Sequence, residues 1–385
     1  MSTEFYWRLP THGCHSSIRR HSIDRGDWSA TDAHHIAPGL DAAGQSDGHS
    51  YIDHLAQIAK AAESVGFLGG LIPSFPNTDD PWVISPLLAR ETKAFRFMIA
   101  YQPGFGNPVH FARASASLQR ATGGRSLFNI ITGGGGHAQL WWGDSFDHDD
   151  RYGRTSEWLD VFRGVWQNED FSYNGRFYQV ENGGLPAHFR TEEFPDLWFS
   201  GSSEAALQVA ARHADYYLSW LEPFDQLADK FARVKERTAA LGGEQKVSVR
   251  VDLVARKTEE EAWADVRQGF ENVAERTREQ WRGNRGDSVG AARLASLKPT
   301  EARHWEDLII APNLWSGFSL LRGGPAIGIV GSYEQCAERL DDLIRLGANG
   351  FILAGTPHLE EAWRVGEEVL PLLGHQAGAL LEAAE

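Results

Sequence analysis

Side chains suited to bind a ligand follow several short apolar runs of the sequence, where predicted strands end. They are mostly hydroxyl, glycine and aromatic residues: Thr11 and His12, Ser74, Thr132 and Gly133–Gly136, Ser200–Ser203, Trp220, Arg250 and Asp252, and Thr356–His358. Carboxylates are scarce in this set, which makes it poorly suited to hold a catalytic metal. The set is better suited to an organic cofactor that brings its own chemistry.

Two of these segments are open to a second interpretation. Ser200–Ser203 precedes a predicted helix, where hydroxyls and free backbone N–H groups form a site for an anion such as a phosphate. The alternative is that Ser203 simply caps the helix, and the sequence leaves both open. Gly133–Gly136 either lets the backbone approach a ligand closely or forms a flexible loop, and its composition favours the loop.

Histidines raise the question of a metal-dependent hydrolase. They stand at His12, His15, His34, His35 and His148, among other positions. Such enzymes need several histidines and carboxylates to converge, and no HxxxH pair occurs in the sequence. The Gly-x-Ser-x-Gly motif of a serine nucleophile is also missing. We therefore expect neither a metal site nor a nucleophilic serine.

The elements that must position these residues alternate between short apolar runs and amphipathic stretches. The apolar runs predict eight strands: Phe5–Leu9, Gly69–Ile72, Phe95–Ala100, Ser126–Ile131, Leu197–Phe199, Tyr216–Ser219, Lys246–Val254 and Gly350–Leu353. Helical periodicity predicts Tyr51–Val65, Pro108–Ala121, Tyr152–Trp166, Glu204–His213, Phe224–Leu241, Tyr333–Leu346 and His358–Leu373.

Eight strands that alternate with helices predict a (β/α)8 TIM barrel, with its active site at the carboxyl ends of the strands. A doubly wound open sheet is the alternative, but it usually has fewer strands, and no Gly-x-Gly-x-x-Gly turn follows any strand here. Because no linker is visible, we expect residues 1–385 to form a single domain.

Three stretches interrupt the alternation and are predicted to be insertions, at about residues 12–50, 170–195 and 259–325. The longest follows the seventh strand. The second is expected to contain a hairpin over Phe171–Val180 with a turn at Asn174 and Gly175. Loops of this length in a compact fold are usually lids or binding elements.

Composition excludes several classes of protein. The 385 residues include 37 Lys and Arg against 52 Asp and Glu, so the net charge is −15, which argues against nucleic acid or an anionic membrane as a partner. With only Cys14 and Cys336, no disulfide framework is available. No apolar run approaches the roughly 20 residues of a membrane span, and the charged Glu4 and Arg8 argue against a secretory signal. We expect a cytoplasmic protein.

Several segments resemble the bacterial-luciferase-like flavin monooxygenases, and among them the alkanesulfonate monooxygenase branch. In order along nearly the whole chain, the matching segments are Phe5–Gly13 (FYWRLPTHG), Leu71–Pro73 (LIP), Arg125–Gly133 (RSLFNIITG), Asp147–Tyr152 (DHDDRY), Phe199–Glu204 (FSGSSE), Tyr217–Pro223 (YLSWLEP), Pro312–Gly324 (PNLWSGFSLLRGG) and Pro357–Gly366 (PHLEEAWRVG). The resemblance implies a TIM barrel that uses reduced FMN (FMNH2) and O2. It also implies a separate NAD(P)H-dependent flavin reductase as partner, and a homodimer or homotetramer.

The resemblance also implies roles for individual residues. The positions that line the flavin or its phosphate in the family match Ser74, Asn129, Thr132, His148, Tyr152, Ser202 and Ser203. Without the resemblance, Tyr152 would be an ordinary helix start and His148 a capping residue. The family's substrate-side tryptophan and its two arginines match Trp220, Arg250 and Arg322, and His12 and Asp252 complete the candidate catalytic set.

Three positions depart from the family pattern. Its Arg-x-His on strand seven is Arg250-Val251-Asp252 here, the tyrosine before the final Pro-His is Thr356, and a cysteine near the flavin is replaced by Thr78. A carboxylate at Asp252 would oppose a sulfonate nearby, unless it pairs with Arg250 or Arg322.

The first hypothesis is a monooxygenase that cleaves the C–S bond of an organosulfonate, an alkane or sugar sulfonate, to give an aldehyde and sulfite. Alternatives are the same flavin chemistry on a sulfone, amine or heterocycle, a non-catalytic flavin-binding homologue, or a metal-dependent hydrolase.

Overall fold

Eight parallel strands close into a barrel in the part of the chain that the computed structural model describes. That part comprises residues 3–11, 45–46, 49–75, 78–191, 193–272, 287–299, 302–322 and 326–374. The barrel strands are β1 (Glu4–Arg8), β4 (Gly69–Ile72), β5 (Arg96–Tyr101), β6 (Ser126–Ile131), β9 (Leu197–Ser200), β10 (Tyr216–Trp220), β11 (Lys246–Arg256) and β15 (Ala348–Ala354). Pairing of β15 with β1 and of β10 with β11 closes the circle, which confirms the predicted TIM barrel.

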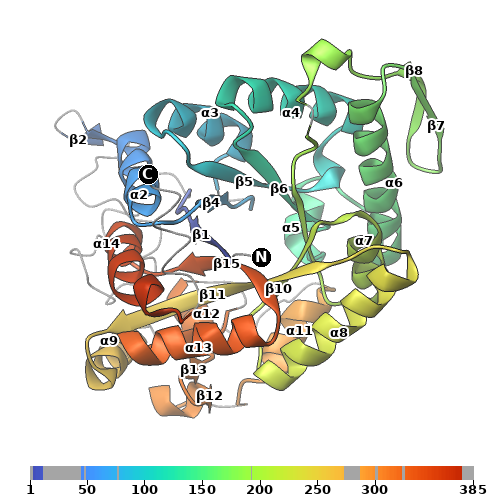
Figure 1. The fold of residues 1–385 in the computed structure, drawn as a ribbon. Coiled ribbons are helices and arrows are strands. Elements are labelled where there is room, and N and C mark those ends of the chain that lie inside the picture. Colours follow the sequence, from blue (N-terminus) through green and yellow to red (C-terminus); the bar gives the residue numbers. More distant parts are fainter. Residues whose placement is uncertain are drawn as a thin grey trace.

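Helices follow the barrel strands and surround them on the outside (Figure 1). They are α2 (Tyr51–Ser64), α3 (Pro81–Glu91), α4 (Pro108–Thr122), α6 (His148–Gln167), α7 (Glu204–His213), α8 (Phe224–Ala240), α13 (Tyr333–Arg345) and α14 (His358–Arg364). Side chains that accept hydrogen bonds from first-turn N–H groups fix several helix starts, among them Asp80, Asn107, Asp147 and Ser203.

Among the helices that surround the barrel, three differ from the predictions by more than one residue. The helix α3 was not predicted, because Pro86 in its middle hides the start signal of Asp80 and Pro81. The cap at Asp147 starts α6 at His148, four residues before the predicted start at Tyr152. The predicted helix His358–Leu373 is regular only to Arg364 and continues as a π turn (Val365–Val369) and a 3-10 turn (Leu370–Leu372).

The strand β11 is longer than predicted and pairs with three strands, with β15 from Val247 to Asp252 and with two others in turn. Its first half pairs with β10, from Lys246 to Arg250, whereas Asp252 to Arg256 pair with β14 (Gly328–Ser332). The strands β13 (Leu314–Trp315) and β12 (Ile309–Ala311) extend this second ladder in antiparallel order. The barrel therefore carries a small side sheet at the carboxyl end of β11.

Large side chains fill the amino-terminal half of the barrel. Trp198 stacks on Tyr216, with ring centroids 4.3 Å apart, and it occupies the space beside Gly350, where a Cβ atom would lie 2.6 Å from the indole. Below them, Glu4 accepts hydrogen bonds from the hydroxyls of Tyr6 and Tyr216. Space for a ligand inside the barrel is therefore left to the carboxyl end.

The predicted insertions contain further short elements. The first contributes β2 (Gln45–Ser46) and β3 (His49–Ser50), and residues 12–44 lie outside the described part. The second contains β7 (Phe171–Asn174), β8 (Gln179–Gly183) and a 3-10 turn (Ala187–Phe189), so the predicted hairpin is confirmed with a longer turn. The third contains α9 (Glu259–Asn272), α11 (Val289–Ser296), a 3-10 turn (Trp305–Leu308) and α12 (Phe318–Arg322).

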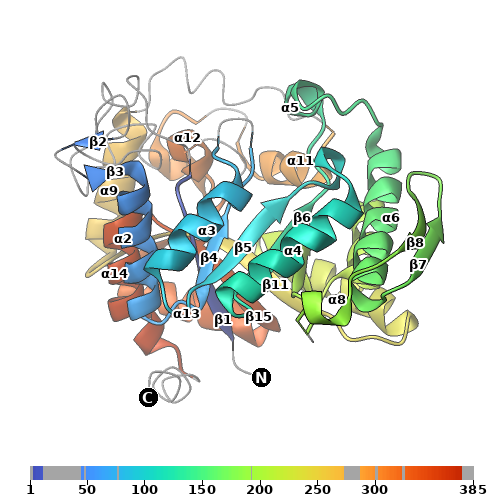
Figure 2. The ribbon, with the colours of Figure 1, turned by 90° about the horizontal axis from the view of Figure 1, so that it is seen from above.

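Figure 2 shows which end of the barrel these additions cover. The amino terminus enters at one end, and α5 (Gly136–Trp141), α11 and α12 lie at the other, which is the carboxyl end of the strands. Among the described helices, none combines the length and apolar character needed to cross a membrane.

Candidate active site

A cluster of hydroxyl groups lies where β6 and β9 end. Tyr152, in the second turn of α6, is buried, and burial raises the pKa of its hydroxyl against the opposing effect of the Ser203 and Thr132 hydroxyls beside it. Tyr217 donates a hydrogen bond to the carbonyl of Gly201 at 2.7 Å. The tyrosine hydroxyls therefore stay protonated and act as donors at the start of α7.

Ser203 is the N-cap of α7, since its Oγ accepts the N–H of Ala206 at 3.2 Å. The capping interpretation is thus confirmed. It is compatible with an anion site, because capping by Ser203 satisfies only one of the N–H groups of the first turn. Ser202 precedes the cap, and its hydroxyl lies close to Tyr217. Hydroxyls and helix N–H groups together make a cradle for a phosphate.

Buried polar atoms without a partner continue this cluster into the barrel. Asn129 follows Leu127 on the inner face of β6, and its Oδ1 atom is buried with no hydrogen-bond partner in the described part of the chain. Oγ1 of Thr132 is also buried without a partner of full hydrogen-bond geometry, although it lies close enough to the Tyr152 hydroxyl to lower its pKa. Because buried polar atoms are normally hydrogen-bonded, these two atoms indicate that a polar ligand completes the site. Ser74, just after β4, is buried at the same end of the barrel.

His148 lies beside Tyr152 at the start of α6. Their ring centroids are 4.9 Å apart, and Nδ1 of His148 is 2.7 Å from a carboxylate oxygen of Asp149. Asp147 caps the helix, so His148 is not the capping residue. The ring is about one quarter exposed, which leaves it accessible to a ligand.

Trp220, Arg250 and Asp252 form a wall on β10 and β11, next to the cradle at the end of β9. Trp220 and Arg250 pair in register on adjacent strands. Asp252, two residues further along β11, binds the guanidinium of Arg250 with both oxygens, at 2.6 and 3.2 Å. Both side chains are buried, at 9% and 5% exposure. The alternative that Asp252 neutralises Arg250 is therefore confirmed.

Sequence reasoning missed Arg8 in this wall, and it named His358 only among the residues that follow the last strand. Trp7 pairs with Leu353 of β15, and Asp252 pairs with the next residue, Ala354, so Arg8 and Asp252 lie at one level on either side of β15. Burial, and then the charge of Arg8, lower the pKa of His358 well below its usual range, so this imidazole is neutral. A charged residue inside the apolar run FYWRL was the available signal for Arg8.

Sequence reasoning also missed a buried ion cluster behind Trp220. Glu222 follows β10 and binds Lys230 of α8 at 2.5 Å and Arg293 of α11 at 2.9 Å. Glu222 and Lys230 are almost fully buried, and burial lowers the pKa of Lys230 although Glu222 opposes this effect. The cluster ties the insertion to the barrel.

Four further positions named in the sequence analysis are Thr78, Thr356, His12 and Arg322. The Thr78 hydroxyl donates to carbonyls of its own loop, at Phe75 and Pro73, so it closes a turn. Thr356 is buried after β15. His12 and the side chain of Arg322 lie outside the described residues, so their predicted roles stay predictions.

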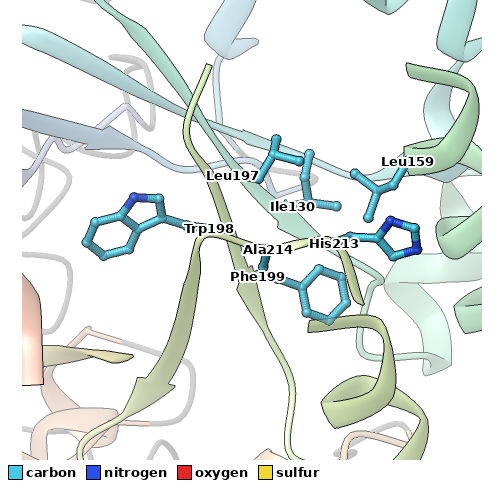
Figure 3. Close-up of a pocket in the computed structure, with 7 residues that line it drawn as sticks. All are labelled: Ile130, Leu159, Leu197, Trp198, Phe199, His213 and Ala214. Carbon is cyan, nitrogen blue, oxygen red and sulfur yellow. The ribbon is translucent and has the colours of Figure 1, made fainter. Parts of the chain in front are cut away.

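One apolar gap in the described part of the chain lies away from this site. A narrow apolar gap of about 130 Å³, which includes space open to solvent, is lined by Ile130, Leu159, Leu197, Trp198, Phe199, His213 and Ala214 (Figure 3). It lies at the amino end of β9, far from the mouth, and the Trp198 ring points away from it. Within the described residues, no group of three or more His, Cys, Asp or Glu side chains is arranged to hold a metal ion.

Known structures share this fold across almost the whole chain. A riboflavin lyase solved with modified FMN and riboflavin is 19% identical and covers 97% of this chain and 91% of its own, with a TM-score of 0.72. An EDTA monooxygenase from Chelativorans sp. BNC1 is 17% identical over 97% and 94%, with a TM-score of 0.68. An F420-dependent secondary alcohol dehydrogenase is 13% identical over 97% and 99%, with a TM-score of 0.65.

The model of one protein family matches residues 32–350, which is most of the chain. That family is described as luciferase-like monooxygenase. The barrel, the additions at its carboxyl end and this match lead to one conclusion: the chain belongs to the luciferase-like monooxygenase family.

Proposed function

We propose that the protein is the oxygenase component of a two-component system. It takes reduced FMN from a separate NAD(P)H-dependent flavin reductase and uses O2 to oxygenate a small organosulfur compound. The observation that carries the proposal is the set of buried polar atoms at the mouth, above all Asn129 Oδ1 and Thr132 Oγ1, beside the hydroxyl cradle of Tyr152 and Ser203. Among similar folds, both FMN-type and F420 cofactors occur.

The residues present fit a flavin mononucleotide. Tyr152 and Ser203, with Ser202 and the N–H groups of α7, would hold the phosphate, because protonated hydroxyls and a helix start are anion donors. Asn129 and Thr132 would bind the polar part of the ring system, which satisfies their unpartnered atoms. The reduced cofactor supplies the activation of O2 when it is bound.

The wall next to this cradle would bind the substrate. Trp220 supplies a flat apolar wall, and Asp252 holds the guanidinium of Arg250 in one orientation. The first turn of α11 packs against Trp220 and Ser202 through Gly290, and there it would help to exclude the water that oxygenation chemistry must avoid.

Two substrate classes remain, and the Arg250–Asp252 pair distinguishes them. An organosulfonate is the first candidate, cleaved at its C–S bond to an aldehyde and sulfite. The second candidate is an uncharged or basic compound, such as a sulfone, a heterocycle or an amine. The ion pair favours the second, because Asp252 already occupies both terminal nitrogens of Arg250 and cancels its charge.

A substrate screen tests the proposal. The protein is incubated with FMN, a flavin reductase, NADH and O2, and sulfonates are compared with sulfones of the same carbon skeleton by mass spectrometry and sulfite release. Oxygenated product that depends on both protein and FMN supports the function. NADH consumption that ends only in hydrogen peroxide across the screen would favour the non-catalytic homologue.

The variant Asp252→Asn separates the two substrate classes. It frees the charge of Arg250, so a sulfonate should bind at least about tenfold more tightly, whereas a sulfone should bind no better. The opposite result is that the wild-type protein turns over a sulfonate and that Asp252→Asn weakens sulfonate binding. This result would mean that the Asp252 carboxylate orients Arg250 to bind the anion.

A further inference from the structure

The hairpin of β7 and β8 packs along the outside of α6, and the proposed function gives it no role. Figure 1 and Figure 2 both show it beside this helix. Its contacts follow a stripe of α6 formed by Asp150, Gly153, Glu157 and Asp160, whose spacing of three and four residues places them on one face. Tyr152 is buried on another face, toward β9. An insertion of this length was expected to be a lid or a binding element, but the hairpin instead contacts the back of the helix that carries Tyr152.

The carboxylate of Glu157 holds the turn of this hairpin. Its Oε1 atom accepts a hydrogen bond from the N–H of Arg176 at 2.9 Å, and its Oε2 atom accepts the N–H groups of Phe177 and Tyr178 at 2.8 and 3.2 Å. Hydrogen bonds to an ionised acceptor are stronger than those between neutral groups, and three consecutive N–H groups share this acceptor. Glu157 stands five residues after Tyr152 in the same helix. The turn and α6 are therefore held in one fixed relation.

Two further contacts of the hairpin reach the first two turns of α6. The Phe177 ring lies against Gly153, where a Cβ atom would be 3.3 Å from it, and it packs edge-on with Phe146, the ring centroids being 5.5 Å apart. Arg176 binds both carboxylate oxygens of Asp150, at 2.6 and 2.8 Å. This ion pair is exposed and contributes little alone, so Phe177 and the carboxylate under the turn carry most of the attachment.

The start of α6 has little apolar support of its own. Residues 148–157 (HDDRYGRTSE) include no aliphatic side chain, and the glycine among them disfavours a helix. Fully buried apolar packing begins only at Trp158. On the inner side, the stretch is tied by Arg151 and Arg154, each paired with an aspartate. Because a short helical segment depends on tertiary contacts for its stability, the hairpin on the outer side helps to decide where Tyr152 lies.

We propose that the β7–β8 hairpin fixes the start of α6 from outside, and that Glu157 is the positioning residue through which it sets the Tyr152 hydroxyl in the cradle. Glu157 stands on the face of α6 away from the cradle, so it acts through the helix alone. The inference rests on the proposed function, since it assumes that Tyr152 binds the flavin phosphate. Its first half, the effect of the hairpin on α6, holds without any flavin.

Hydrogen–deuterium exchange, read by mass spectrometry, tests the effect on the helix. Glu157→Gln keeps the shape of the side chain but replaces one acceptor oxygen with an NH2 group, and Phe177→Ala removes the packing on Gly153. Both variants should raise the exchange rate of residues 148–157 by at least about fivefold, because these turns then open more often. Peptides from the barrel strands should exchange as in the wild type.

Tyr173→Phe is the matched control on the same hairpin. It keeps the ring and removes only the hydroxyl that donates to Asp160 at 3.4 Å, about two turns beyond Tyr152. This variant should leave the exchange of residues 148–157 at the wild-type rate. An exchange rate that is unchanged in both test variants would overturn the inference, whatever the flavin does.

Anaerobic titration with reduced FMN and reduced riboflavin tests the effect on the cradle. In Glu157→Gln and Phe177→Ala the affinity for FMN should fall at least about threefold, whereas the affinity for riboflavin, which lacks the phosphate, should not change. A role in folding stability alone would lower the affinity for neither flavin or for both alike. Either result would contradict Glu157 as a positioning residue and leave the proposed function intact. If the wild-type protein binds no reduced flavin, the proposed function fails, and the link from Glu157 to the cofactor fails with it.

Discussion

Removing the Asp252 carboxylate should destabilise the protein strongly, because it leaves the Arg250 charge buried without its partner. The two side chains are 9% and 5% exposed and share two hydrogen bonds, at 2.6 and 3.2 Å. Breaking a buried pair from one side costs about 3–5 kcal/mol, and the Asp252→Ala variant should lose stability in that range. Most of this cost is the uncompensated guanidinium rather than the lost contact.

Replacement of both partners separates these two contributions. In Arg250→Met/Asp252→Leu no buried charge remains, so the double variant should recover most of the loss and unfold within about 1–2 kcal/mol of the wild type. Equilibrium urea unfolding, followed by tryptophan fluorescence, measures each variant. The exposed pair Arg267–Glu271 gives the reference, because Arg267→Ala should cost no more than about 1 kcal/mol.

The reasoning would be refuted by a loss in Asp252→Ala as small as that in the Arg267→Ala control. Such a result would mean that water reaches Arg250 freely and that the wall beside Trp220 is open. A double variant less stable than Asp252→Ala would also contradict the account. It would show that the loss in Asp252→Ala does not come from the unpaired charge of Arg250.

Three further predictions concern the cradle and the helix layer. Ser203→Ala removes the cap of α7, so it should lower the free energy of unfolding in urea by about 1 kcal/mol. It should also weaken the binding of reduced FMN, and an unchanged FMN affinity would show that Ser203 caps the helix without contacting the cofactor. Tyr152→Phe removes a protonated donor and should weaken reduced FMN roughly tenfold but leave riboflavin unaffected, as anaerobic titration would show. Burial lowers the pKa of His213 to about 3, so its contribution to stability is present above about pH 6.5 and is lost as the pH falls toward 3. In the wild type the free energy of unfolding should fall as the pH drops below 6, and in His213→Gln this slope should be smaller by up to about 1.4 kcal/mol per pH unit. An unchanged slope would contradict a buried, neutral His213.

The barrel was predictable from the sequence because its strands are buried on both faces and therefore form continuous apolar runs. Strand β11 shows the limit of this signal: the apolar pattern predicts an end at Val254, whereas pairing with β14 carries the strand to Arg256. The side sheet depends on contacts between distant segments, which periodicity does not reveal. The helix α3 was missed for a local reason. Its start is well capped by Asp80, but the proline inside the helix, Pro86, argued against a helix at this place.

The candidate site was predictable where its residues stand in the motifs of the resembled family, as Asn129 in β6, Thr132 after β6, Tyr152 in α6 and Ser203 before α7 do. The two ion pairs that hold the α11 segment were not predictable, because each joins residues far apart in the sequence. Arg151 and Asp287 are separated by 136 positions, and Glu222 and Arg293 by 71. Only Arg250 and Asp252, two apart on one strand and thus on one face, could be expected to meet.

An anaerobic titration with reduced FMN tests the central claim most directly. The account predicts saturable binding of one flavin per chain, weakened by at least about tenfold in Tyr152→Phe/Ser203→Ala. Absence of binding to the wild-type protein, or equal affinity in the double variant, would contradict the placement of the cofactor in the hydroxyl cradle at the carboxyl end of the barrel.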